Sequence, residues 1–100
     1  MEGDKIRVLA KRTDSGWYVT NVSNSLENLQ RFVGGYIETV TIARDLVIIC
    51  NEEGRIKGLP YNCAICGIDF VGDILVAGVD ADEFCDVPCT LKDWKEINGC

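Results

Sequence analysis

The chain has 100 residues, of which 47% are hydrophobic and 26% charged, a composition typical of one folded domain rather than a disordered segment. Its formal net charge is -6 and it contains no histidine. These two features disfavour direct binding to DNA or RNA and exclude catalytic or metal sites that need an imidazole. The N-terminus is charged and carries no apolar signal segment, and the longest apolar run, Leu46 to Cys50, is too short to span a bilayer. We therefore expect a cytosolic protein that makes no membrane contact.

The first third of the chain predicts a hairpin followed by a helix. Two β-rich runs, Lys5 to Ala10 and Trp17 to Val22, flank a short polar turn, which is the pattern of a β-hairpin. Apolar residues then recur at helical spacing from Leu26 to Val33. Gly34 is expected to end this helix in the left-handed conformation that glycine adopts cheaply.

Two strands of different character are predicted next. The run from Tyr36 to Ile42 alternates strictly, as expected for a strand with two unlike faces. The run from Leu46 to Cys50 is uniformly apolar, which favours a central strand covered on both sides. A connection marked by glycine and proline, Arg55 to Asn62, follows.

The last third predicts a single strand and a short terminal helix. The strand is expected between Asp69 and Asp80 and is most regular from Ile74 to Val79, and Thr90 is placed to cap a helix from Leu91 to Ile97. The order ββαββ–loop–βα predicts one α+β domain over residues 1–100. We expect a mainly antiparallel sheet of four to six strands, with the first helix packed on one face.

The six cysteines admit two interpretations. They are Cys50, Cys63, Cys66, Cys85, Cys89 and Cys100. The spacing of Cys63 to Cys66 and of Cys85 to Cys89 is close to that of a four-thiolate zinc site, which leaves a zinc-stabilised structural module as an alternative. Free thiols are the simpler interpretation, because Val87-Pro88 interrupts the second pair. We therefore predict no metal and no other cofactor.

The polar loop after the second pair of strands is the candidate ligand site. The predicted ligand-binding residues are Gly35, Tyr36, Asn51, Arg55, Lys57, Tyr61 and Asn62. Amides can read a base edge, arginine and lysine can pair with phosphate, tyrosine can stack, and glycine lets backbone N–H groups approach an anion. The same residue types also serve as turns, caps and corners, and the neighbouring Glu52 and Glu53 would weaken phosphate binding.

Three motifs carry a family resemblance. They are Val33-Gly34-Gly35-Tyr36-Ile37-Glu38, Asn51-Glu52-Glu53-Gly54 and Gly58-Leu59-Pro60-x-Asn62. In order and spacing the chain resembles an uncharacterised family of small domains of unknown function from bacteriophages and mobile elements of Firmicutes and related gut bacteria. It departs from that pattern at Cys63, where the family carries a basic residue.

The resemblance implies a phage or mobile-element gene product that acts in the cytoplasm of a host bacterial cell, and it implies no established activity. Because the chain lacks catalytic residues, we expect an accessory protein that is not an enzyme. Small proteins of this kind often blunt host defence, so the leading hypothesis is a sponge that sequesters a nucleotide-derived immune signal. Such a protein would gain from forming a homo-oligomer, because sites between subunits can enclose a ligand. The alternative is an inhibitor that acts as an acidic decoy and binds a host defence protein.

Overall fold

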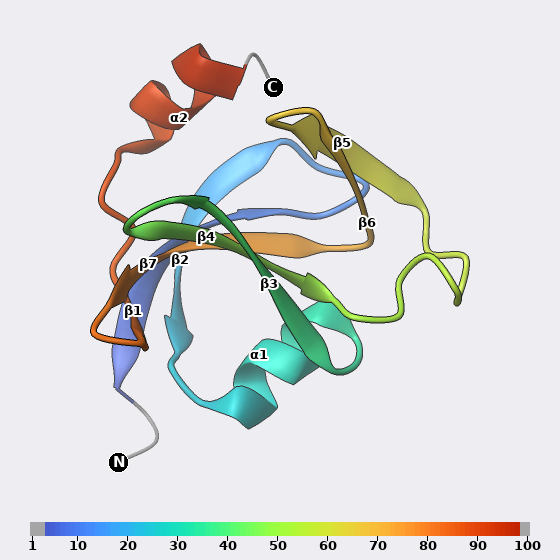
Figure 1. Ribbon diagram of the computed structural model, residues 1–100, viewed down its shortest axis with the longest axis horizontal. Coiled ribbons are helices and arrows are strands. Elements are labelled where there is room, and N and C mark those ends of the chain that lie inside the picture. Colours follow the sequence, from blue (N-terminus) through green and yellow to red (C-terminus); the bar gives the residue numbers. More distant parts are fainter. Residues whose placement is uncertain (1–3, 99–100) are drawn as a thin grey trace.

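The computed structural model describes residues 4–98 and belongs to the α+β class that the sequence predicts (Figure 1). A six-stranded sheet, a separate two-stranded hairpin and two helices make up this part of the chain. In chain order the elements are β1 (Lys5–Lys11), β2 (Trp17–Ser23), α1 (Leu26–Val33), β3 (Ile37–Ala43), β4 (Leu46–Asn51), β5 (Tyr61–Ile65), β6 (Ile68–Val71), β7 (Ile74–Asp80), β8 (Glu83–Cys85) and α2 (Leu91–Asn98).

The main sheet is antiparallel and places a late strand between two early hairpins. Its order is β2-β1-β7-β4-β3, so the hairpins β1–β2 and β3–β4 lie on either side of β7. The short β8 pairs with the end of β7. The sheet therefore ends at β2 on one side and at β3 on the other, and both of these edge strands are predicted by the sequence.

The central strand β4 shows why the sheet needs cover on both faces. Val47 and Ile49 pack in a cluster with Leu29 and Val33 of α1, whereas Ile48 and Cys50 belong to a second cluster on the opposite face. All four β4 side chains are buried, because successive residues of a strand point to opposite sides of the sheet. The expectation of a doubly covered strand from Leu46 to Cys50 is confirmed.

Helix α1 covers one face and is capped at both ends, at Gly34 as the sequence predicts. The Ser25 hydroxyl accepts a hydrogen bond from the Asn28 backbone N–H at the first turn. At the other end Gly34 has φ +82°, and its N–H bonds to the Gln30 carbonyl. The N–H of Gly35 reaches the same carbonyl, which completes a compact helix end directly before β3.

The opposite face is covered by a hairpin that the sequence does not predict. The strand expected between Asp69 and Asp80 is present over its most regular part, as β7. It does not run through the whole range, because the chain breaks at Gly72 (φ +76°) and forms a separate strand, β6, before it. The connection expected to run through Asn62 ends earlier, at Tyr61, where β5 begins. Strands β5 and β6 pair with each other and lie across the main sheet (Figure 1).

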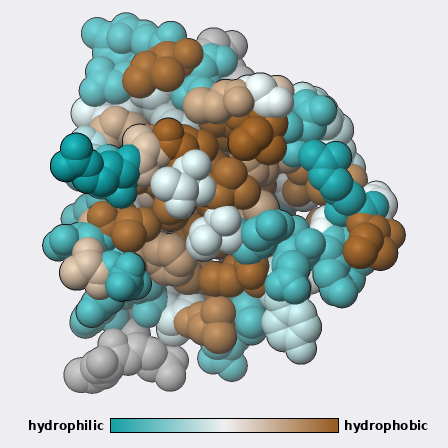
Figure 2. Space-filling model, viewed as in Figure 1, coloured by the Kyte–Doolittle hydropathy of each residue, from teal (hydrophilic) through white to brown (hydrophobic). Residues whose placement is uncertain are grey.

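Helix α2 completes the cover of this second face. Thr90 caps it, as expected, by accepting a hydrogen bond from the Asp93 N–H. Trp94 is 2% exposed and meets Trp17 edge to face, with 5.3 Å between ring centroids. Within residues 4–98, neither helix is long and apolar enough to cross a membrane. In Figure 2 hydrophobic side chains gather in the middle of the visible surface and hydrophilic residues surround them.

Candidate functional site

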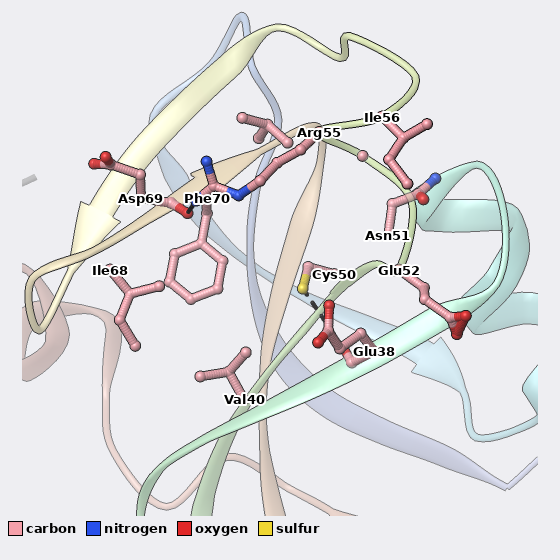
Figure 3. Close-up of a pocket in the computed structure, with 12 residues that line it drawn as sticks. Glu38, Val40, Cys50, Asn51, Glu52, Arg55, Ile56, Ile68, Asp69 and Phe70 are labelled. Carbon is pink, nitrogen blue, oxygen red and sulfur yellow. Dashed lines mark hydrogen bonds between the residues drawn. The ribbon is translucent and has the colours of Figure 1, made fainter.

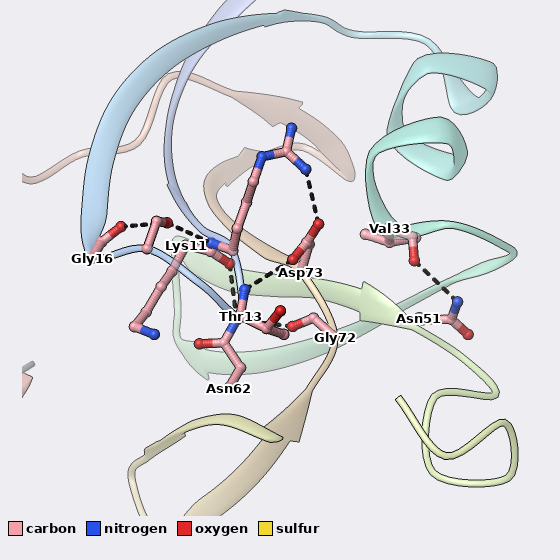
Figure 4. Close-up of polar contacts among 10 residues, drawn as sticks. Lys11, Thr13, Gly16, Val33, Asn51, Asn62, Gly72 and Asp73 are labelled. Carbon is pink, nitrogen blue, oxygen red and sulfur yellow. Dashed lines mark hydrogen bonds and ion pairs between the residues drawn. The ribbon is translucent and has the colours of Figure 1, made fainter. Parts of the chain in front are cut away.

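Asn51, one of the expected ligand-binding residues, is committed to the fold. It ends β4 and is 6% exposed. Its amide nitrogen donates to the Val33 carbonyl (3.0 Å; Figure 4). Its amide oxygen accepts from the Glu53 N–H (2.8 Å), so Asn51 joins the end of α1 to the loop that follows β4. A Cβ on Gly35 would lie 2.9 Å from the Asn51 side-chain nitrogen. Close packing against Asn51 therefore accounts for a glycine at this position.

Asn62 has a comparable structural role elsewhere in the molecule. It lies in β5 and is 8% exposed. Its amide nitrogen donates to the carbonyls of Lys11 (2.9 Å) and Gly72 (2.8 Å), which ties the β5–β6 hairpin to the main sheet (Figure 4). The amide nitrogens of both asparagines therefore donate to backbone carbonyls.

The basic and aromatic residues of the expected site do not converge either. Arg55 donates to the Asp69 backbone carbonyl (2.7 Å), and the Tyr61 hydroxyl donates to the Asp69 carboxylate (3.4 Å). Lys57 makes a long contact of 3.5 Å with Glu53. Tyr36 is 67% exposed and lies just before β3. The seven expected residues are thus distributed over four places: the Gly35–Asn51–Lys57 corner, the exposed Tyr36, the outer side of the hairpin with Arg55 and Tyr61, and the hairpin anchor at Asn62.

A hollow of about 370 Å³ lies between β3–β4, the following loop and β6, and we call it the acidic cleft (Figure 3). Its lining residues are Glu38, Val40, Cys50, Asn51, Glu52, Gly54, Arg55, Ile56, Ile68, Asp69, Phe70 and Val71. Of the expected ligand-binding residues, only Asn51 and Arg55 belong to this lining. Its charged groups are three carboxylates and one guanidinium, a balance that disfavours a phosphate-bearing ligand.

Cys50 contributes a thiol to the cleft. Its sulfur lies 3.6 Å from the Glu38 carbonyl, to which the thiol donates. Burial, together with the nearby Glu38 carboxylate, raises the pKa of Cys50 to about 11. At neutral pH the side chain is therefore a neutral thiol, which is a poor nucleophile and a poor metal ligand.

A second hollow, of about 340 Å³, lies between α1 and β2, and we call it the arginine groove. Its lining residues are Arg12, Asn21, Val22, Ser23, Asn28, Arg31 and Phe32. This lining contains two arginines, three polar side chains and one aromatic ring, and no carboxylate. An adjoining hollow shares Arg12, Arg31 and Phe32 and extends toward Leu59 and Asp73.

Both guanidinium groups in the groove are held in place by neighbours. Arg12 lies over the Phe32 ring at 4.4 Å from its centroid and pairs with the Asp73 carboxylate at 2.8 Å. Arg31 donates to the side-chain oxygen of Asn28 (3.0 Å), which is one helical turn earlier. Each arginine is exposed and keeps other N–H groups for a ligand.

Sequence reasoning missed Arg12 and Arg31 because nothing in the local pattern marks them. Arg12 directly follows a strand, and Arg31 lies on the polar side of a helix, which are ordinary positions for arginine. Their proximity depends on how α1 crosses the β1–β2 hairpin. A pattern of hydrophobic periodicity predicts that the helix packs on the sheet and does not predict over which strands.

The cysteine pairs occupy unlike environments. Cys63 is buried in the core, whereas Cys66 is exposed and, with Gly67, forms the tight β5–β6 turn. Cys85 and Cys89 are half-buried, and burial raises the pKa of both thiols. Within residues 4–98, no group of three or more His, Cys, Asp or Glu side chains is arranged to hold a metal ion. Cys100 lies outside the described residues.

Comparison with known proteins identifies a family and no characterised relative. Neither the curated proteins nor the solved structures include a match to this chain. A family match covers residues 6–97, which include every element of the fold except the first residue of β1 and the last residue of α2. The expected resemblance to a domain of unknown function is confirmed at that level: the chain belongs to the family described as domain of unknown function DUF3846.

Proposed function

We propose that this protein is a non-catalytic accessory protein of a bacteriophage or mobile element that counters host defence by sequestering a nucleotide-derived signal. The observation that carries the proposal is the arginine groove. Two guanidinium groups face a hollow whose lining has no carboxylate, although the chain as a whole carries a net charge of -6. Arg12 pairs with Asp73, which lies just outside this lining, whereas Arg31 donates to the neutral amide of Asn28. A local positive site in an acidic protein favours a specific anionic ligand.

The groove offers the three kinds of contact that a nucleotide needs. Arg12 and Arg31 supply N–H groups for phosphate, which guanidinium binds through two parallel hydrogen bonds. The amides of Asn21 and Asn28 and the hydroxyl of Ser23 can pair with ribose or a base edge. The volume of about 340 Å³ is within the usual range for small-molecule sites, about 300–1,000 Å³.

The same lining supports binding without turnover. It has no carboxylate, thiol or imidazole that could transfer a proton near neutral pH or form a covalent intermediate. A bound nucleotide would therefore be held and released intact. A homo-oligomer that covers the groove would enclose the ligand more completely, which would favour tight sequestration.

The test is retention of an intact ligand. The purified protein is incubated separately with a cyclic dinucleotide, a cyclic oligoadenylate and cyclic ADP-ribose, freed of excess ligand, and heat-denatured. Mass spectrometry of the supernatant should recover one of these unaltered. Recovery of none of them, or of a hydrolysed product, would contradict the proposal.

Three matched variants locate the site. Arg31→Gln should weaken binding by about tenfold or more, since it removes a charged phosphate contact. Arg44→Gln makes the same charge change in the exposed β3–β4 turn and should leave the affinity unchanged. Arg55→Gln tests the polar loop that the sequence predicts as the ligand site. If Arg55→Gln weakens binding and Arg31→Gln does not, the ligand occupies the acidic cleft and the groove proposal is wrong.

A further inference from the structure

Strand β3 presents a free hydrogen-bonding edge. It is the last strand of the main sheet, and within residues 4–98 no other strand pairs with its outer side. The Glu52 N–H donates to the Tyr36 carbonyl (2.9 Å) just before the β3–β4 ladder begins. Since hydrogen-bonded residues alternate along an antiparallel strand, the backbone groups of Ile37, Thr39 and Thr41 point away from β4.

The acidic cleft lies directly beside this edge. Glu38 and Val40 of β3 belong to its lining, opposite Ile68 and Phe70 of β6 (Figure 3). Ile68 is 41% exposed, and Ile56, on the adjoining loop, is 87% exposed. An extended chain that paired with β3 would direct every second side chain toward this apolar surface.

The charge of the cleft determines the kind of partner. Glu38, Glu52 and Asp69 contribute three carboxylates to the lining. They outweigh the single guanidinium, which already donates to a backbone carbonyl. Lysine and arginine side chains on the incoming strand would meet these carboxylates favourably. A second copy of this chain would instead bring its own acidic cleft and a net charge of -6 to the contact.

We propose that the β3 edge and the acidic cleft bind an extended segment of another protein that alternates apolar and basic side chains on one face. The segment adds to the sheet as a further antiparallel or parallel strand beside β3. Backbone hydrogen bonds supply affinity, and the cleft supplies the preference for apolar and basic residues. This surface is separate from the arginine groove, which borders the opposite edge strand, β2.

A fluorescence anisotropy titration tests the proposal with a defined probe. The probe is the labelled peptide Val-Thr-Lys-Thr-Val-Thr-Lys, which places valine and lysine on one face and threonine on the other. The control peptide has glutamate in place of lysine. We expect saturable binding of the lysine peptide and at least about tenfold weaker binding of the glutamate peptide. Equal affinity for both peptides, or no binding of the lysine peptide, would overturn the proposal.

Two variants separate edge pairing from charge, and each has a control. Thr39→Pro removes an outward N–H without removing a ladder hydrogen bond, so it should weaken binding by about tenfold while the fold persists. Val19→Pro is the matching control on the other edge strand, β2. The Asn24 N–H donates to the Asp4 carbonyl, and hydrogen-bonded residues alternate along the strand, so the Val19 N–H points away from β1. This variant should have no effect on binding. Glu38→Lys should weaken lysine-peptide binding similarly, whereas Glu27→Lys on α1 should not.

Analytical ultracentrifugation addresses self-pairing through the same edge. The proposal expects that Thr39→Pro leaves the sedimentation of the free protein unchanged. A wild-type dimer that Thr39→Pro converts to a monomer would assign the edge to a second copy of the chain and overturn the proposal. Peptide binding that both Thr39→Pro and Glu38→Lys leave intact would overturn it as well.

Discussion

The arginine groove and the acidic cleft are similar in volume and opposite in charge. The groove borders β2 at one edge of the sheet and has two arginines and no carboxylate in its lining. The cleft borders β3 at the other edge and has three carboxylates and one arginine. A net charge of -6 describes neither site. Partners are therefore better inferred from each surface separately, which is why we assign an anion to one and a basic segment to the other.

The two hollows also differ in what holds them together. The groove is formed by α1 and the β1–β2 hairpin, which are neighbours in sequence. The cleft depends on the β5–β6 hairpin, which folds back over strands that precede and follow it. Changes in the hairpin should therefore damage the cleft first, and this difference can be tested by mutation.

The largest expected effect is from Phe70→Ala. Phe70 is 4% exposed and belongs to the core beneath the hairpin as well as to the cleft lining. Removal of a buried aromatic ring should cost about 3–5 kcal/mol of unfolding free energy, measured by urea denaturation. Ile68→Ala, on the same strand but 41% exposed, should cost less than about 1 kcal/mol. Equal losses from the two variants would show that the hairpin does not pack as described.

Asn62→Ala should have the next largest effect. It leaves the part-buried carbonyl of Lys11 and the buried carbonyl of Gly72 without their donor, at an expected cost of about 2–4 kcal/mol in unfolding free energy. Amide hydrogen exchange should become faster in β5 and β6 while β1 and β2 stay protected. Uniformly faster exchange over the whole sheet would contradict a local role as hairpin anchor.

The elements that the sequence predicts correctly are those with local signals. The run from Leu26 to Val33 has helical spacing, a serine cap and a terminal glycine, and the structure contains that helix with those boundaries. The run from Leu46 to Cys50 is apolar throughout and is buried on both faces. In each case the side-chain pattern and the final environment agree, so the prediction needs no knowledge of distant contacts.

The β5–β6 hairpin and the true surroundings of the polar loop could not be predicted in that way. Gly72 breaks the expected strand because it adopts φ +76° and packs against Leu59, a residue that is remote from it in sequence. Asn51 and Asn62 are of a type suited to ligands, and only the tertiary fold shows that backbone carbonyls occupy their amide nitrogens. Residue type alone therefore cannot tell a ligand contact from a hydrogen bond that holds the fold together.

Alkaline pH should weaken the protein through Cys50, in the cleft. Its pKa is about 11 in the folded protein and about 9 when exposed, so the folded state keeps this proton over a range where the unfolded chain loses it. The contribution to stability is complete below pH 9 and is lost as the pH rises through about 11, by roughly 3 kcal/mol in total. Urea denaturation between pH 8 and about 11 measures it. The Cys50→Ser variant should not show this loss of stability at alkaline pH. An identical decline in the wild-type protein and the variant would contradict a role of the Cys50 thiol.

The smallest expected effect is the most direct test of the contrast between the two hollows. Arg31→Gln and Glu38→Lys are each assayed with the nucleotide that the protein retains and with the lysine-containing peptide. Arg31→Gln should weaken nucleotide binding by about tenfold, about 1.4 kcal/mol, and leave peptide binding unchanged. Glu38→Lys should do the reverse, because its carboxylate lies in the cleft and not in the groove. Both assays use moderate salt, which screens distant charges. If either variant weakens the binding of nucleotide and of peptide to the same extent, the two hollows act as one site and the separate assignments are wrong.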